Sequence, residues 1–242
     1  SNTVRHLSSN GTSQLFGSSS LPGGHAEYVR VPNADATLTK IAASGEERAV
    51  LTGGTAGLGV NVATAAMSKS PEGSYAVVGC DPIGLTALIA LKNSGNSKQI
   101  IAIEDHTARL TLASGFANQA LRSNDALPIK QMDVVIIGSV REAPEFETAV
   151  SLVRPGGFII FSEPYGHTRS SEPSVVLPEG VTLSAASWPT NEDAKKIVTA
   201  MQIKRLDLTP IVSHVIPLDE AQEAYEAAAG PGQGVQKVLL KP

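Results

Sequence analysis

The central part of the chain repeats one pattern, in which a short apolar run is followed by a longer segment with helical spacing. Four apolar runs have the length of buried strands, namely residues 74–79, 99–103, 133–137 and 158–162. Apolar residues three or four apart follow at residues 82–92, 107–114 and 142–152. Strands buried on both faces give continuous apolar runs, whereas half-exposed strands alternate. The pattern therefore predicts a parallel sheet covered by helices on both faces, an α/β fold of the Rossmann-type doubly wound class.

The flanking segments are less regular. Residues 1–23 are rich in Ser, Gly and Asn and are expected to form a loop or a partly ordered arm. An alternating segment at 26–32 predicts a strand, and 46–68 reads as a helical stretch interrupted by glycines. Further elements are expected as strands at 119–121, 181–187, 211–216 and 235–240, helices at 191–203 and 219–229, and a turn at 154–157.

Composition narrows the class of protein. The 242 residues are 42% hydrophobic and 17% charged, which is typical of a globular chain. A net charge of -4 and only 4% aromatic residues argue against nucleic acid or an anionic membrane surface as a partner. Cys80 is the one cysteine, so an internal disulfide and a multi-cysteine zinc cluster are excluded. With no apolar run long enough for a membrane helix and no secretory signal pattern, we expect a cytoplasmic protein with a small-molecule substrate.

A glycine-rich loop follows the first of these apolar runs. Residues 79–84 read Gly-Cys-Asp-Pro-Ile-Gly, where a dinucleotide-binding loop has Gly-x-Gly-x-x-Gly. Gly79 and Gly84 keep the first and last glycines, but Asp81 replaces the middle one. The middle glycine lets the backbone approach a pyrophosphate, so a carboxylate there opposes phosphate binding. Loss of nucleotide binding and recruitment of Asp81 to a new site are the two interpretations.

Glu104 ends the second apolar run, 104 − 84 = 20 residues after the last glycine. An acid at this spacing binds the adenosine ribose of NAD in dinucleotide-binding folds. Gly79, Gly84 and Glu104 are therefore the candidate cofactor-binding residues. The alternative for Glu104 is a solvated acid at the end of a strand.

Side chains suited to acid–base chemistry follow the ends of several predicted strands, where open parallel sheets bind their ligands. The candidate catalytic residues are Asp81, His106, Tyr165 and His167. Each has a simpler interpretation: His106 starts a helix, and Tyr165 and His167 lie in an exposed Pro/Gly/Ser-containing loop. Cys80 reads as a small loop residue, because no base is assigned to it.

Several motifs occur in the order found in a known family. They are residues 24–36, residues 78–85, Ile101–Glu104 with Arg109, Leu110 and Ala113, residues 154–157, and residues 217–221 with Ala224 and Tyr225. Over roughly residues 15 to 242, the chain resembles the medium-chain dehydrogenases/reductases, the zinc alcohol dehydrogenases. The resemblance implies a Rossmann-type domain at residues 46–204. It also implies a remnant of the catalytic domain at 1–45 and a C-terminal segment at 205–242 that packs with this remnant.

The same resemblance shows what departs from the family. The N-terminal zinc-binding catalytic domain has no counterpart in this sequence, and the third zinc ligand would fall near Thr52, a poor zinc ligand. We therefore expect no metal site. Relatives pair their last Rossmann strands across a two-fold axis, which predicts a homodimer through Val181–Ser187.

Three hypotheses for function follow. The first is a repurposed, redox-neutral enzyme of the cyclase, isomerase or lyase type, which acts on a small organic molecule without a cofactor. The second is a zinc-independent oxidoreductase with NAD(P) as cofactor, in which Glu104 favours NAD. The third is a non-catalytic binding module, in which alanine at the four candidate catalytic positions would leave function intact.

Overall fold

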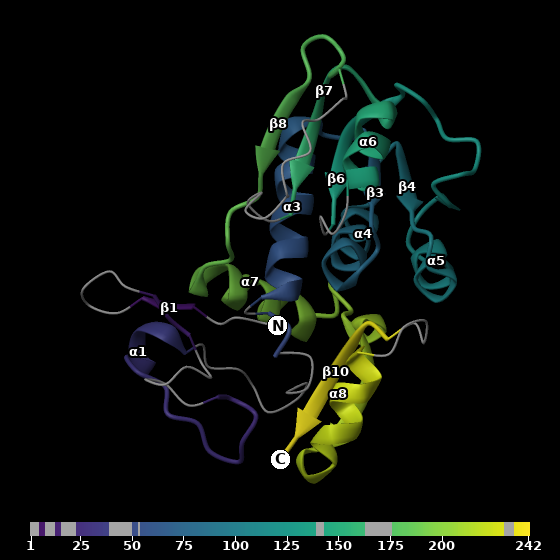
Figure 1. Ribbon diagram of the computed structural model, residues 1–242. Coiled ribbons are helices and arrows are strands. Elements are labelled where there is room, and N and C mark those ends of the chain that lie inside the picture. Colours follow the sequence, from purple (N-terminus) through teal and green to yellow (C-terminus); the bar gives the residue numbers. More distant parts are fainter. Residues whose placement is uncertain are drawn as a thin grey trace.

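The computed structural model describes residues 5–7, 13–15, 23–38, 50–52, 54–138, 143–162, 176–229 and 235–242. Its centre is a six-stranded sheet in the order β5-β4-β3-β6-β7-β8, with every neighbouring pair parallel (Figure 1). The strands are β3 (Ser74–Val78), β4 (Gln99–Ile103), β5 (Gln119–Leu121), β6 (Met132–Ile137), β7 (Val153–Phe161) and β8 (Thr182–Ala185). The chain winds outward from β3 to β5, returns to β6 and winds to the other edge, which is the Rossmann order. The predicted fold class is confirmed.

Each face of the sheet has its own apolar core because neighbouring residues of a strand point to opposite faces. Tyr75 and Val77 join one core, and Ala76 and Val78 join the other. Helices α3 (Thr55–Lys69), α4 (Pro82–Ser94), α5 (Thr107–Ser114) and α7 (Asn191–Gln202) contribute to the first core. Helix α6 (Ala143–Leu152) contributes to the second. Helices on both faces explain why the strands are continuously apolar in sequence.

Two sequence-based predictions of elements are wrong. Residues 26–32 form no strand: Tyr28 is 89% exposed, and no neighbouring strand within the described ranges pairs with this segment. The expected turn at 154–157 is part of β7, whose pairing with β6 shifts register there. In both cases pairing with a neighbouring strand, which local sequence does not report, decided the outcome. The N-terminal arm, expected as a loop or partly ordered, contains the antiparallel pair β1 (Arg5–Leu7) and β2 (Ser13–Leu15).

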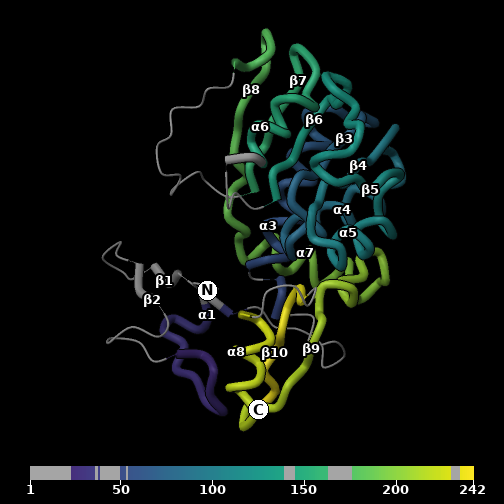
Figure 2. The backbone as a smooth tube through the Cα atoms, turned by 45° about the vertical axis from the view of Figure 1, so that its right-hand side comes forward, coloured from purple at the N-terminus to yellow at the C-terminus, as the bar shows by residue number. Residues whose placement is uncertain are grey.

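A smaller C-terminal unit lies below the sheet in Figures 1 and 2. It consists of the parallel pair β9 (Val212–Pro217) and β10 (Lys237–Lys241) and helix α8 (Ala221–Ala229), with short turns η1 (Thr209–Ile211) and η2 (Leu218–Glu220). Residues 23–38, with the short helix α1 (Ala34–Thr37), lie beside this unit. Nδ1 of His25 and the hydroxyl of Tyr225 are 2.5 Å apart across this contact. Residues 23–38 and helix α8 are therefore in contact, although they are about 200 positions apart in the sequence.

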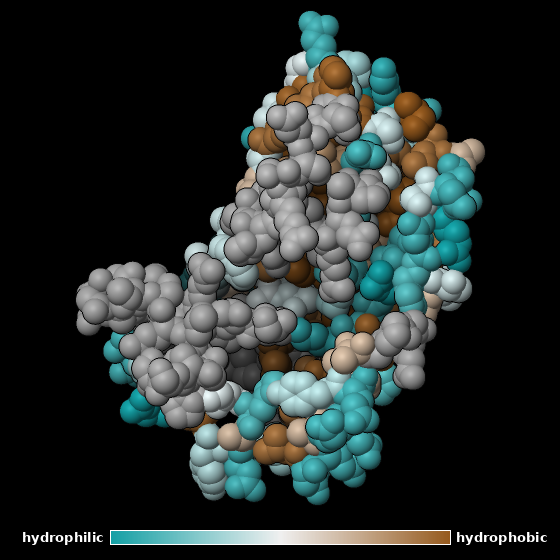
Figure 3. Space-filling model, in the orientation of Figure 1, coloured by the Kyte–Doolittle hydropathy of each residue, from teal (hydrophilic) through white to brown (hydrophobic). Residues whose placement is uncertain are grey.

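The visible face of the molecule is hollowed between the sheet and the C-terminal unit (Figure 3). The carboxyl end of β3 and the start of β10 approach each other in this region, as the contacts of Lys237 described below show. Within the described ranges, no helix combines the length and apolar character needed to span a membrane.

Candidate functional site

The loop after β3 lies at the point where the strand order reverses, between β3 and β6. Gly79 adopts a positive φ of 82°, and its N–H donates to the Ile103 carbonyl at 2.9 Å. A Cβ atom on Gly84 or on Gly138 would clash with the carbonyl oxygen of Gly79. These contacts form a tight glycine cradle, defined here by Gly79, Gly84 and Gly138, of the kind that lets backbone approach a dinucleotide.

Asp81 lies in this cradle as the N-cap of α4. Its Oδ1 accepts hydrogen bonds from the N–H groups of Ile83 at 3.1 Å and Gly84 at 3.0 Å. The residue is only 7% exposed, and Pro82 takes the first helical position. Asp followed by Pro before an apolar helical segment is a typical N-cap sequence. The N-cap role of Asp81 was therefore predictable, but the comparison with the dinucleotide-binding pattern considered only its missing glycine. The first-turn N–H groups that a bound phosphate would use are thus already paired with a carboxylate.

Glu104 holds the next loop together. Its Oε2 accepts from the N–H of Cys80 at 2.8 Å and from Nε of Arg109 at 2.9 Å. Its Oε1 accepts from the N–H of His106 and from Nη2 of Arg109, both at 2.8 Å. Burial raises the pKa of Glu104, but the hydrogen bonds from Arg109, His106 and Cys80 outweigh it, so the pKa lies below its ordinary value. The carboxylate is therefore ionised and bridges the loops after β3 and β4.

Sequence reasoning found Glu104 but missed its partner. The solvated interpretation of Glu104 is wrong, because the residue is 6% exposed. Arg109, on the first turn of α5, forms a bidentate pair with it. The sequence did contain a signal for this pair: Arg109 lies in the first turn of the helix predicted after Glu104, where an arginine can reach back to the acid.

His106 starts α5 without capping it through its side chain. Its Nδ1 is buried and has no hydrogen-bond partner within the described part of the chain. Asp105 instead accepts from the N–H and the hydroxyl of Ser123 and pins the loop after β5. Asp81 and His106 lie in neighbouring loops, the ones after β3 and β4. Glu104 joins these two loops by accepting the N–H groups of Cys80 and His106. Tyr165 and His167 fall outside the described residues, so their role stays a prediction.

Cys80 is fully buried beside these acids. Burial, followed by the nearby charges of Glu104 and Asp81, raises the pKa of its thiol well above the ordinary value. The protonated thiol agrees with the interpretation of Cys80 as a packing residue, since the thiolate is the nucleophilic form.

Lys237 brings a cation from the C-terminal unit to the same place. Its Nζ lies 3.5 Å from Oγ1 of Thr55, at the start of α3. Burial lowers the pKa of Lys237, and the negative charge of Asp81 opposes this shift. The sequence analysis missed this residue, because a single lysine in a terminal strand carries no distinguishing local pattern.

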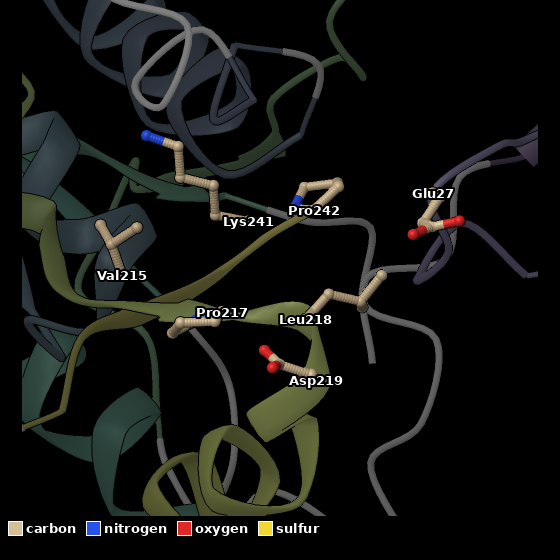
Figure 4. A pocket seen from close by; sticks show the side chains of 7 residues that line it. All are labelled: Glu27, Val215, Pro217, Leu218, Asp219, Lys241 and Pro242. Atoms are coloured by element: carbon tan, nitrogen blue, oxygen red, sulfur yellow. The ribbon is translucent and has the colours of Figure 1, made fainter.

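A second hollow of about 610 Å³ lies between residues 23–38 and the C-terminal unit (Figure 4). Its lining residues are Glu27, Val215, Pro217, Leu218, Asp219, Lys241 and Pro242. Figure 4 shows the carboxylates of Glu27 and Asp219 near Leu218, while the ammonium of Lys241 extends away from them. Lys241 and Lys237 are at opposite ends of β10, so this hollow is separate from the glycine cradle. Over the described part of the chain, no three His, Cys, Asp or Glu side chains gather as a group that could hold a metal ion.

Known proteins with similar sequences are dehydrogenases and reductases. Zinc-type alcohol dehydrogenase B of Aspergillus flavus is 26% identical over 95% of this chain and 56% of its own length. An L-threonine 3-dehydrogenase of Bacillus subtilis is 28% identical over 91% of this chain and 65% of its own. A medium chain reductase/dehydrogenase of an Acremonium species is 30% identical over 60% of this chain and 55% of its own. The chain thus spans between about half and two thirds of the length of these curated relatives. No protein-family model matches the chain.

Solved structures share the fold. Zinc-dependent alcohol dehydrogenase 2 from Streptococcus pneumonia superposes with a TM-score of 0.76 at 22% identity, over 90% of this chain and 65% of that one. An alcohol dehydrogenase of E. coli CFT073, complexed with NADH, gives 0.69 at 21% identity, over 84% and 62%. The strand order agrees with the fold of these solved structures. In sequence, the chain is similar to zinc-type alcohol dehydrogenases and to a medium chain reductase/dehydrogenase.

Proposed function

We propose that the chain is a zinc-independent oxidoreductase that uses NAD(P) to act on a small organic carbonyl or enone compound. The observation that carries the proposal is the glycine cradle, whose close packing is retained at Gly79, Gly84 and Gly138 beside the buried acid Glu104. The dehydrogenase relatives, which match nine-tenths of the chain, support the same class of reaction.

The residues around the cradle fit a dinucleotide in two respects. A Cβ atom at Gly84 or Gly138 would clash with the carbonyl oxygen of Gly79, so these glycines allow the close packing that a dinucleotide-binding loop has at its last glycine. The buried Nδ1 of His106, which has no hydrogen-bond partner among the described residues, is a polar atom that a ribose hydroxyl would satisfy. Glu104, Arg109 and His106 would hold the adenosine ribose, and Lys237 would face the pyrophosphate.

The bound nicotinamide would supply a hydride to the carbonyl or enone carbon, and a proton would complete the reduction. This chain would position the substrate at the carboxyl ends of β6 and β7 and provide the proton. Tyr165 and His167 follow β7 in the sequence, and we propose them as the proton donors.

The second candidate is the redox-neutral enzyme, and one observation favours it. The Asp81 carboxylate occupies the N–H groups that would bind the pyrophosphate. In this case Asp81 itself would act as an acid–base group on a substrate without phosphates.

A panel of aldehydes, ketones and enones, assayed with NADH or NADPH, separates the two candidates. The oxidoreductase predicts loss of reduced-nicotinamide absorbance and a product heavier than its substrate by two hydrogens. Tyr165→Phe and His167→Gln should then lower kcat by about 100-fold, whereas Tyr225→Phe, outside the cradle, should not. Turnover without cofactor to a product isomeric with its substrate, or lacking water, would overturn the proposal.

We also propose that the chain forms a homodimer through the edge strand β8. Leu183 on this strand is 42% exposed, and Trp188 just after it is 50% exposed. A sheet edge that pairs with no described strand and carries exposed apolar side chains favours pairing with a second copy. Leu183→Glu should convert a dimer to a monomer in light scattering, whereas a monomeric wild-type protein at micromolar concentration would contradict the proposal.

A further inference from the structure

Asp81 supplies a negative charge at the position where the proposed cofactor would place one. Its carboxylate pairs with the N–H groups of Ile83 and Gly84, the first free donors of α4. A phosphate at a helix N-terminus uses the same donors and the same helix dipole. The internal carboxylate and an external phosphate therefore cannot occupy these donors together.

Two cations on different elements lie near Asp81. The negative charge of Asp81 raises the pKa of Arg109 on α5, after the larger effects of burial and Glu104, and opposes the burial that lowers the pKa of Lys237 on β10. Arg109 lies on the side of Glu104, and Lys237 lies at Thr55 on the start of α3.

The glycines around this carboxylate form a tightly packed loop. Gly79 keeps its positive φ, and the contacts of Gly84 and Gly138 with its carbonyl leave no room for side chains. Both close approaches keep the loop in the tight conformation of a dinucleotide-binding loop. Relative to the Gly-x-Gly-x-x-Gly pattern, the departure is Asp81, whose carboxylate accepts the N–H groups of Ile83 and Gly84.

We propose that Asp81 is an internal competitor of the dinucleotide pyrophosphate and sets the cofactor affinity of this chain. This inference rests on the proposed function, because it concerns the same cofactor site. When NAD(P)H binds, its pyrophosphate must displace the Asp81 carboxylate from the N–H groups at the start of α4. The affinity for the cofactor is therefore low while the carboxylate is present. Ligands that share the adenosine part but carry no phosphate avoid the competition.

The test compares wild type with Asp81→Ser, since serine caps a helix without a charge. Calorimetry with adenosine, ADP and NADH measures binding without catalysis. ADP and NADH should bind about tenfold more tightly or better to the variant, while adenosine should change by less than about twofold. Asp193→Ser is the matched control: it removes a carboxylate from the first turn of α7, away from the cradle, and should leave all three affinities within about twofold.

The outcomes separate this inference from the proposed function. Equal ADP affinity in wild type and Asp81→Ser would overturn the competitor, even if both proteins catalysed hydride transfer. An equal gain for adenosine and ADP would also overturn it, because the effect would not depend on phosphate. If ADP binds more tightly to Asp81→Ser but neither protein reduces a carbonyl or an enone, the role of Asp81 as a competitor is supported and the proposed oxidoreductase activity is contradicted. Absence of ADP binding to either protein would overturn both.

Discussion

Two buried carboxylates at neighbouring strand ends behave differently. Asp81 and Glu104 are exposed by 7% and 6%, and each accepts backbone N–H groups. Glu104 joins the loops after β3 and β4 and is neutralised by the bidentate Arg109. Asp81 binds N–H groups of its own helix, and its cationic neighbours Arg109 and Lys237 come from other elements. The comparison teaches that burial alone does not say what an acid does. The two differ in what they connect, since Glu104 joins two loops whereas Asp81 caps the first turn of its own helix.

Among the substitutions considered, Glu104→Ala is expected to have the largest effect on the stability of the fold. Removing the carboxylate leaves the guanidinium of Arg109 and two backbone N–H groups without their acceptor, which should lower the free energy of unfolding by about 3 kcal/mol. Urea denaturation followed by circular dichroism measures this loss. A loss below about 1 kcal/mol would show that Glu104 is no more structural than Asp81.

Acid should weaken the fold through the same residue. Because the pKa of Glu104 is lower in the folded chain than its ordinary 4.5, its contribution is complete above 4.5 and is lost as the pH falls through the lowered value. Thermal unfolding from neutral pH down to acid should therefore show a steeper loss for wild type than for Glu104→Gln. Parallel curves would place the acid-sensitive group elsewhere.

Arg109→Lys tests whether the pair needs its two-point geometry. Lysine keeps the charge but cannot donate to both oxygens of Glu104 in one plane, so stability should fall by about 1 kcal/mol. Arg154→Lys is the matched control, because Arg154 donates from Nε to Oδ1 of Asp133 at 2.7 Å and is more exposed than Arg109. Equal losses for the two variants would mean that the double contact adds nothing.

Asp81→Ser should have the smallest effect on stability, within about 1 kcal/mol, because serine still caps α4. Its effect should appear in phosphate binding, as described above. A loss as large as that of Glu104→Ala would make both carboxylates structural and remove the contrast between them.

The sheet was predictable because its strands are buried on both faces and its helices have clear spacing. The predicted bounds of β4, β5 and α5 coincide with those observed, and β3, β6 and α4 differ by no more than two residues at an end. The strand expected at 26–32 is absent. Alternation of apolar and polar residues predicts which side chains share a face, but it does not show whether a neighbouring strand is there to pair with, and Tyr28 points into solvent.

The candidate site was predictable only in part. Asp81, His106 and Glu104 were found from their positions after strand ends, which the fold brings to one edge. Arg109 and Lys237 were missed since their roles depend on contacts between separate elements, at Glu104 and at Thr55. Tyr165 and His167 remain predictions from sequence.

The central claim is that this chain still binds a nicotinamide dinucleotide, weakened by Asp81. A calorimetric titration of the wild-type protein with NADH and NADPH, with the fluorescence of Trp188 followed in parallel, tests it most directly. The account predicts saturable binding with a Kd of about 0.1–1 mM for at least one of the two. No binding of either up to about 10 mM would contradict it and turn the search to redox-neutral substrates.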